Sequence, residues 1–183
     1  MDLALLVIRV VVGGLLFAHG TQKLFGWFGG HGLDGSGGWL ESLGFKPGRP
    51  MAMLAGGVEA VGGSLLLLGL LTPLAAAMIV GQMTVAALAV HRDKGLWNTN
   101  GGYELNVVYA TAALAIAFIG PGAFSLDEVL DLANSGMGYG IGALLVGGGA
   151  AILVEAFRRA QVQDAGEETE GTPSERQGER RAA

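Results

Sequence analysis

The sequence has 183 residues, of which 51% are hydrophobic and only 15% are charged, and its formal net charge is −5. In a water-soluble domain, about a quarter of the residues are usually charged, so the composition predicts a membrane protein. The acidic balance leaves no basic surface for nucleic acid. Because the chain has no cysteine, disulfide chemistry and cysteine-ligated iron–sulfur clusters are excluded.

Two apolar runs in the first part of the chain have the length of membrane-spanning helices, about 20 residues. Residues 3–24 form the first run, and it lacks the basic start of a signal peptide, so we interpret it as a retained helix. Residues 51–70 form the second. Between them, residues 25–50 are rich in glycine and predict an interfacial loop.

Three further helices are predicted after Leu71. Thr72 suits the cap of the next helix and Pro73 its first turn. The third, fourth and fifth predicted helices cover residues 73–91, 103–119 and 137–157. Between the last two, Ser125 to Glu128 form a capping-box pattern that predicts a short surface helix over 126–134.

These elements predict an all-α fold, a polytopic transmembrane helix bundle. Its parts are a four-helix membrane domain over residues 1–135, an additional transmembrane helix within 136–160, and a disordered acidic tail over 161–183. The lipid bilayer is therefore the first partner of the chain, and assembly into a homo-oligomer stays open.

The basic residues of the predicted short loops and helix ends all fall on one side of the membrane. They are Lys23, Lys46, Arg49, Arg92, Lys94, Arg158 and Arg159. Such residues favour the cytoplasmic side. The sequence thus predicts a cell-membrane protein with the N-terminus outside and the C-terminus in the cytoplasm.

Ionisable residues inside membrane helices are functional candidates because each is costly unless it is paired or hydrated. Counting 1.5 Å per residue from the helix ends places Glu59 between Arg9 and His19 in depth. We therefore expect an Arg9–Glu59 ion pair. It could serve ligand or proton handling, or it could only fix the first helix against the second.

Other polar residues are expected to converge at the cytoplasmic membrane boundary. His19 and Lys23 share a helix face, although Lys23 could also be an ordinary interfacial lysine. The complete candidate polar or ligand site is Arg9, His19, Lys23, Glu59, His91, Asn100 and Glu104. A haem between His19 and His91 has little support, and no compact ligand spacing predicts a metal.

Several blocks of the sequence resemble the DoxX family. They are residues 13–30, Glu59 within 56–63, residues 96–104 and residues 119–127. The resemblance implies a four-helix protein of the bacterial or archaeal cytoplasmic membrane. The family is tied to redox metabolism: relatives resemble the membrane subunit of thiosulfate:quinone oxidoreductase, and some members associate with superoxide dismutase and a sulfurtransferase-like protein.

The resemblance implies a redox-associated membrane subunit or anchor that acts with partner oxidoreductases in quinone-linked metabolism or oxidative stress. Quinone is the candidate ligand, and His19, Glu59 and Glu104 would contact its headgroup. Any turnover would belong to a quinone-linked assembly and not to this chain alone. Two alternatives stay open: a small-solute transporter with a pathway lined by Arg9 and Glu59, and a non-catalytic membrane scaffold.

Overall fold

The computed structural model describes residues 1–170 of the chain, and this part is helical, without strands. The five long helices are α1 (Asp2–Phe25), α3 (Gly48–Leu68), α4 (Thr72–Ala86), α5 (Glu104–Ile119) and α7 (Met137–Glu170). The shorter elements are η1 (Trp27–Gly29), α2 (Gly32–Ser42), η2 (Ala87–His91), η3 (Arg92–Lys94), η4 (Asn98–Asn100) and α6 (Leu126–Val129). The all-α prediction is confirmed for the described residues.

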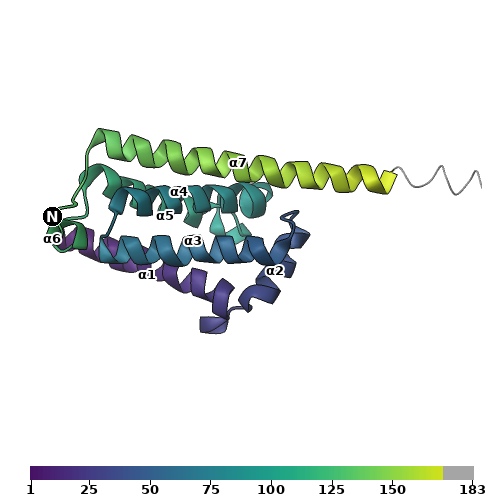
Figure 1. Cartoon of the computed structure of the whole chain (residues 1–183), viewed down its shortest axis with the longest axis horizontal. Helices are drawn as coiled ribbons and strands as arrows, with labels where there is room; N and C mark the ends of the chain where they lie inside the picture. Colours follow the sequence, from purple (N-terminus) through teal and green to yellow (C-terminus); the bar gives the residue numbers. More distant parts are fainter. Residues whose placement is uncertain (171–183) are drawn as a thin grey trace, which may run out of the picture.

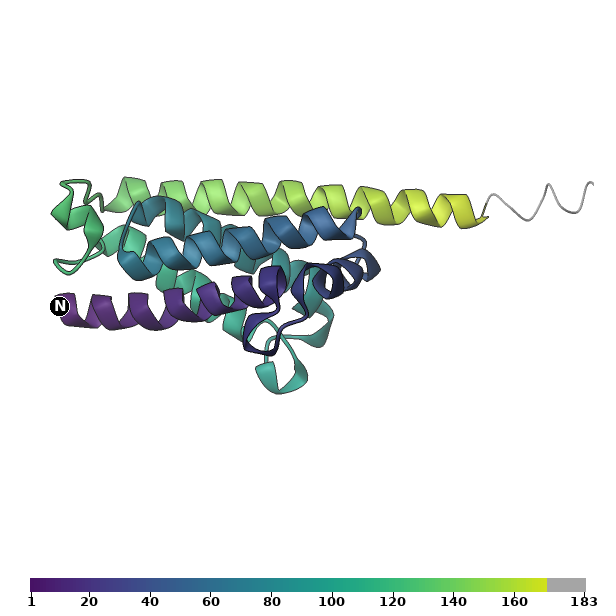
Figure 2. The same cartoon turned by 60° about the horizontal axis from the view of Figure 1, so that its bottom comes forward.

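The long helices lie along one common axis and form a bundle (Figures 1 and 2). The helix α1 packs against α3, and α4 packs against α3, α5 and α7. The N-terminus and α6 lie at one end of the bundle, and α2 lies toward the other, where α7 extends beyond its neighbours (Figure 1). We call these the α6 end and the α2 end.

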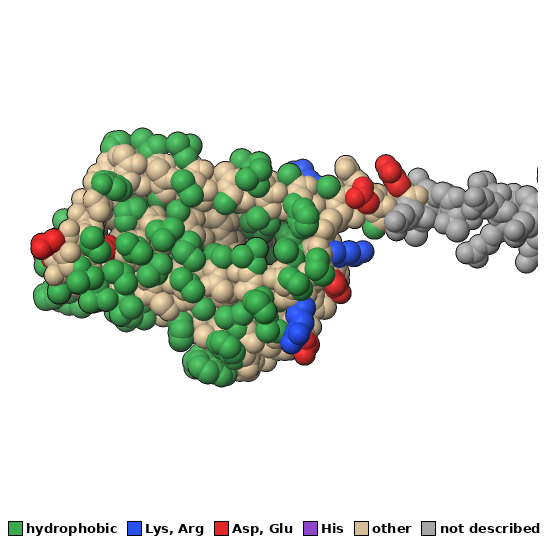
Figure 3. Space-filling view, in the orientation of Figure 1, with side chains coloured by type: hydrophobic (Ala, Val, Ile, Leu, Met, Phe, Trp, Pro, Cys, Tyr) green, Lys and Arg blue, Asp and Glu red, His purple; other side chains and the backbone are tan. Residues whose placement is uncertain are grey.

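Within the described residues, four helices are long and apolar enough to cross a membrane: α1, α3, α7 and the helix that starts at Thr72 and continues through η2 and η3 to Lys94. The helix α5, which corresponds to the fourth predicted span, has only 16 residues and is shorter than a typical span. Hydrophobic side chains cover much of the outer surface of the bundle (Figure 3). The chain is a multi-pass helical membrane protein.

Glycines let α1 and α3 approach backbone to backbone. A Cβ atom on Gly13 would lie 2.6 Å from the Gly63 carbonyl oxygen, and one on Gly63 would lie 2.5 Å from the Phe17 nitrogen. Farther along the pair, Gly20 faces Gly56 in the same way. Small residues are the usual means of close helix packing in lipid, and these contacts fix the register of α1 on α3.

The prediction of a loop between the first two helices is wrong, because this glycine-rich segment contains α2 (Gly32–Ser42). Glycine disfavours helix by about 1 kcal/mol relative to alanine, but tertiary packing outweighs this cost. Leu40 is buried in one cluster with Phe45 and Ala52. A Cβ on Gly37 would lie 3.0 Å from the Arg49 backbone, so a glycine permits the close contact between α2 and α3.

The helix α7 is longer than predicted. The sequence predicts an end near residue 157 and disorder from 161, but the helix continues to Glu170; residues 171–183 lie outside the described residues. Arg158 does not end the helix. Its guanidinium bonds Glu155 one turn earlier, donates to the Leu43 carbonyl oxygen at 3.0 Å and lies over the Phe45 ring.

The short helix α6 contains a fully buried acidic residue, Asp127, although the sequence predicts a surface helix. Ser125 caps α6 as predicted, accepting a hydrogen bond from the Glu128 N–H at 3.2 Å. The carboxylate of Asp127 accepts from the Leu71 N–H at 2.7 Å and from the Thr72 N–H at 2.9 Å. The sequence predicts Thr72 as the cap of α4, but Asp127 supplies the cap from a distant segment.

Candidate functional site

Lys23, Glu59 and Gln82 form a hydrogen-bonded group inside the bundle. The Lys23 ammonium pairs with Oε1 of Glu59, and the Gln82 amide donates to the same oxygen at 3.1 Å. The three residues come from α1, α3 and α4. Glu59 is only 4% exposed, and its Oε2 has no hydrogen-bond partner in the described structure. An acidic residue this deeply buried is stabilised only by such partners.

The prediction of an Arg9–Glu59 ion pair is wrong, because the two residues have other partners. The guanidinium of Arg9 is 1% exposed and donates to two backbone oxygens, that of Pro121 at 2.5 Å and that of Phe124 at 2.5 Å. Arg9 therefore ties α1 to the α5–α6 connection at the α6 end. In the described residues Arg9 and Glu59 therefore have different partners at different heights of the bundle.

The register of α1 on α3 explains this correction. Because Gly20 faces Gly56 and Ala60, Glu59 is level with residues near 20 of α1. Arg9 lies about 15 Å away along the axis, at 1.5 Å per residue. It contacts the end of α3 at Gly69. The depth estimate assumed that both helices start at one membrane surface, whereas α1 extends past α3 at the α6 end.

The other predicted site residues do not join Lys23 and Glu59 in one hydrogen-bonded cluster within the described residues. His91 bonds through Nδ1 to the Gly101 carbonyl oxygen at 2.6 Å. Glu104 accepts from the Asn98 N–H at 2.9 Å, and Asn100 is exposed in η4. These contacts organise the connection between α4 and α5. His19 is exposed and is level with Glu59 but on another face of α1.

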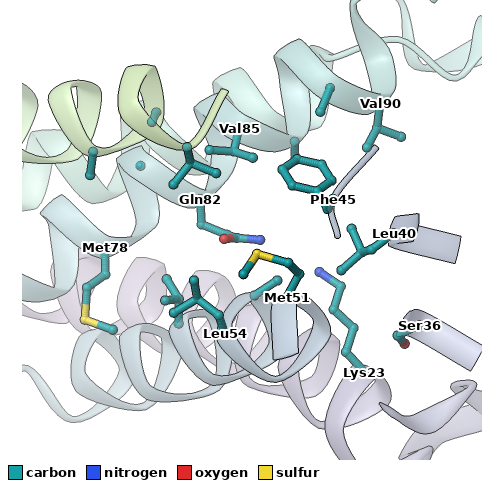
Figure 4. Close-up of a pocket in the computed structure, with 18 of the residues that line it drawn as sticks. Lys23, Ser36, Leu40, Phe45, Met51, Leu54, Met78, Gln82, Val85 and Val90 are labelled. Atoms are coloured by element: carbon teal, nitrogen blue, oxygen red, sulfur yellow. The ribbon is translucent and has the colours of Figure 1, made fainter. Parts of the chain in front are cut away.

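A cavity of about 330 Å³ lies beside the group, and Lys23 and Gln82 line it. Figure 4 shows both polar side chains extending toward one another among apolar neighbours. Ser36 and Trp39 of α2 also line the cavity. Its apolar lining comes from α3, α4, η2, α7 and the residues around α2, and includes Leu40, Phe45, Met51, Leu54, Val58, Met78, Val85, Val90, Val146 and Val154.

A π-helical turn forms part of the cavity wall. The chain of α4 continues as η2, which is a π-helix over Ala87–His91, and Ala89 and Val90 of this turn line the cavity. Such turns are rare and occur frequently at functional sites. The sequence predicts a continuous helix here, because hydrophobic periodicity does not distinguish one widened turn from regular helix.

The polar end of the cavity offers hydrogen bonds of both kinds. An ammonium group has three donors and an amide group has two donors and an acceptor, whereas Glu59 takes up one donor from each of Lys23 and Gln82. The remaining donors fit a carbonyl oxygen, and the Gln82 carbonyl fits a hydroxyl. The pair of Lys23 and Glu59 is neutral overall, which suits an uncharged polar headgroup.

Gln82 and Trp39 are two cavity residues that the predicted site lacks. Gln82 is a polar residue inside a predicted membrane helix, and this signal was available, but nothing in the sequence shows that it faces Glu59. Trp39 belongs to the segment predicted as a loop. Among the described residues, no group of three or more His, Cys, Asp or Glu side chains is placed to hold a metal ion.

The fold and this site define a helical membrane protein with a buried ion pair beside an apolar cavity. The chain belongs to the DoxX family, whose family model matches residues 4–92. That region includes Lys23, Glu59 and Gln82. An uncharacterized protein of Haemophilus influenzae is 33% identical over 128 residues, which are 66% of this chain and 86% of that relative. No solved structure matches the chain significantly.

Proposed function

We propose that the chain is a redox-associated membrane subunit that binds a quinone headgroup in the cavity beside Lys23, Glu59 and Gln82. The observation that carries the proposal is the placement of a neutral, hydrogen-bonding group at one end of an otherwise apolar cavity of about 330 Å³. A pocket of this size with a few convergent polar groups is typical of small-molecule sites.

The chemistry of the three residues supports a quinone. A quinone supplies two carbonyl acceptors and takes up two electrons and two protons when it becomes a quinol. Lys23 and Gln82 would donate hydrogen bonds to a carbonyl oxygen, and Gln82 would accept from a hydroxyl. Glu59, with one oxygen free of protein partners, is suited to hold a proton near the headgroup.

The electrons would come from a partner oxidoreductase. The chain has no cysteine and so no cysteine-ligated cluster of its own. The likeness of DoxX relatives to the membrane subunit of thiosulfate:quinone oxidoreductase supports such a partner. In this assembly the chain binds quinone in the membrane and anchors the soluble redox protein.

We further propose that the α2 end faces the cytoplasm of a cell membrane. The basic residues Lys46 and Arg49 lie around α2, and basic side chains appear at that end in Figure 3. The α6 end exposes Glu128 and Asp131 instead. Lysine and arginine in short loops favour the cytoplasmic side, which places the N-terminus outside and the C-terminus inside.

Trp39 provides a direct test because it lines the cavity, whereas Trp97 does not. Bound quinones quench nearby tryptophan fluorescence. The chain has three tryptophans, so Trp27→Phe/Trp97→Phe leaves Trp39 as the only one. We expect a benzoquinone with a ten-carbon tail, added to this variant in lipid vesicles, to quench its emission saturably.

The matched control is Trp27→Phe/Trp39→Phe, which leaves only Trp97, an exposed residue in the connection between α4 and α5. Its emission should show only the weak, linear quenching of random encounters in the membrane. Linear quenching of the same strength in both variants would contradict a quinone site at the cavity.

A further inference from the structure

The cavity is part of a groove on the side of the bundle. The helix α4 packs against both α3 and α7, whereas α3 and α7 have little contact with each other. The floor of the groove is therefore α4, and its walls are α3 and α7. Figure 3 shows the lateral surface hollowed between α7 and α3. Small residues on the floor and on α7, including Gly81 and Ala150, keep the groove open.

The groove is polar at one end only. Lys23, Ser36 and Gln82 lie toward the α2 end. From Gln82 toward the α6 end, the floor presents Met78 and Leu74, which extends the apolar part by about 12 Å at 1.5 Å per residue. A molecule lying in the groove would have its head near the membrane surface and its tail toward the bilayer centre, as lipids do.

The side of the groove opens onto the lipid-facing surface of the bundle. Its rim residues are strongly exposed although they are apolar: Leu54 is 53%, Leu74 is 49% and Val146 is 64% exposed. The α2 end, in contrast, is closed by Phe45, which is 4% exposed and lies beneath the Arg158 guanidinium. A ligand therefore reaches Lys23 and Gln82 from the bilayer.

We infer that the quinone of the proposed function enters sideways from the bilayer between α3 and α7, and that its isoprenoid tail lies in this groove along α4. The inference rests on the proposed function. A phospholipid is the competing occupant, but its phosphate would need an unpaired cation. Lys23 is already paired with Glu59, so the polar end matches an uncharged headgroup. The α7 residues Val146 and Ala150 thereby select for tailed quinones.

The test is to fill the groove at Ala150, an exposed α7 residue of its lining. Ala150→Phe in the Trp39-only protein should weaken quenching by a ten-carbon-tailed benzoquinone about tenfold, because overpacking a binding groove costs on this order. Quenching by the same headgroup without a tail should change less than about twofold, because its contacts with Lys23 and Gln82 remain.

The matched control is Ala156→Phe, at an exposed alanine of α7 outside the groove, and it should leave both ligands unaffected. If Ala150→Phe fails to fold, Val146→Phe at the rim replaces it, which adds no tryptophan to the Trp39-only protein. Equal affinity of the groove variant and the Trp39-only parent protein for the tailed quinone would overturn the side entrance, while the headgroup site stands. If neither quinone quenches the Trp39-only protein saturably, the proposed function fails and the inference fails with it.

Discussion

Replacing Lys23 with methionine is expected to destabilise the folded protein by about 3–5 kcal/mol, which is the usual cost of removing one partner of a buried ion pair and leaving the other charge unpaired. The substitution removes the ammonium that pairs with Glu59, which is 4% exposed and would keep only Gln82 as a partner. SDS-driven unfolding of the purified protein in mild detergent measures this change in the free energy of unfolding.

The double variant Lys23→Met/Glu59→Met tests whether the loss of stability in Lys23→Met comes from the unpaired charge of Glu59. Removing both charges leaves no unpaired charge, and only the Gln82 amide loses its acceptor, so most of the lost free energy of unfolding should be recovered, to within about 1–2 kcal/mol of wild type. His19→Met is the control on α1, where an exposed side chain should change stability by less than about 0.5 kcal/mol. A single variant as stable as His19→Met would show that the pair is not formed.

Replacing Asp127 with alanine is expected to destabilise the protein by about 3 kcal/mol or more. Its carboxylate is fully buried and accepts hydrogen bonds from the Leu71 N–H, the Thr72 N–H and the Thr72 hydroxyl. Each buried donor left without a partner costs about 1–3 kcal/mol. The same carboxylate acts electrostatically on Arg9, so its removal also leaves a buried cation without an opposing charge.

The turn that Asp127 holds is strained, which adds to the expected effect. Leu71 has φ 46, a left-handed conformation that is costly for a leucine. Glu128→Ala is the matched control, because Glu128 is the neighbouring acid and is exposed. Thermal unfolding should separate the two variants by several degrees. Equal midpoints would contradict the role of Asp127 as the distant cap of α4.

The long helices follow from the sequence because hydrophobic length is a strong signal in a membrane protein. The runs 3–24 and 51–70 correspond closely to α1 and α3. Thr72 and Pro73 correctly mark the start of α4, because a proline is tolerated in the first turn. The signal depends only on local composition, and tertiary contacts do not change it.

The pairing of the charged residues could not be predicted, since it depends on how far one helix slides along the next. Glu59 pairs with Lys23 instead of Arg9 because backbone contacts at Gly20 and Gly63 set the register. A depth count from helix ends contains no information on this shift. The sequence correctly indicated that Glu59 needs a basic partner, but not which one.

Helix α2 and the extension of α7 depend on contacts between distant segments. Gly37 lies against Arg49, which a glycine-rich composition does not reveal. Arg158 donates a hydrogen bond to the Leu43 carbonyl oxygen, 115 residues away in the sequence. The sequence predicts the end of the helix at this basic residue, but the distant contact holds Arg158 inside a longer helix. The segment around α2 contributes Ser36, Trp39, Leu40 and Phe45 to the cavity wall, so this part of the cavity could not be predicted either.

The central claim is that the Lys23–Glu59–Gln82 group binds a quinone, and the quinone retained by the purified protein tests it most directly. Wild type and Lys23→Met/Glu59→Met should be isolated in lipid particles, extracted with organic solvent and compared with protein-free particles. We expect wild type to retain quinone at up to one molecule per chain above the lipid background, and the folded double variant to retain none above it. Equal amounts in the two proteins, or none above background in either, would contradict the account.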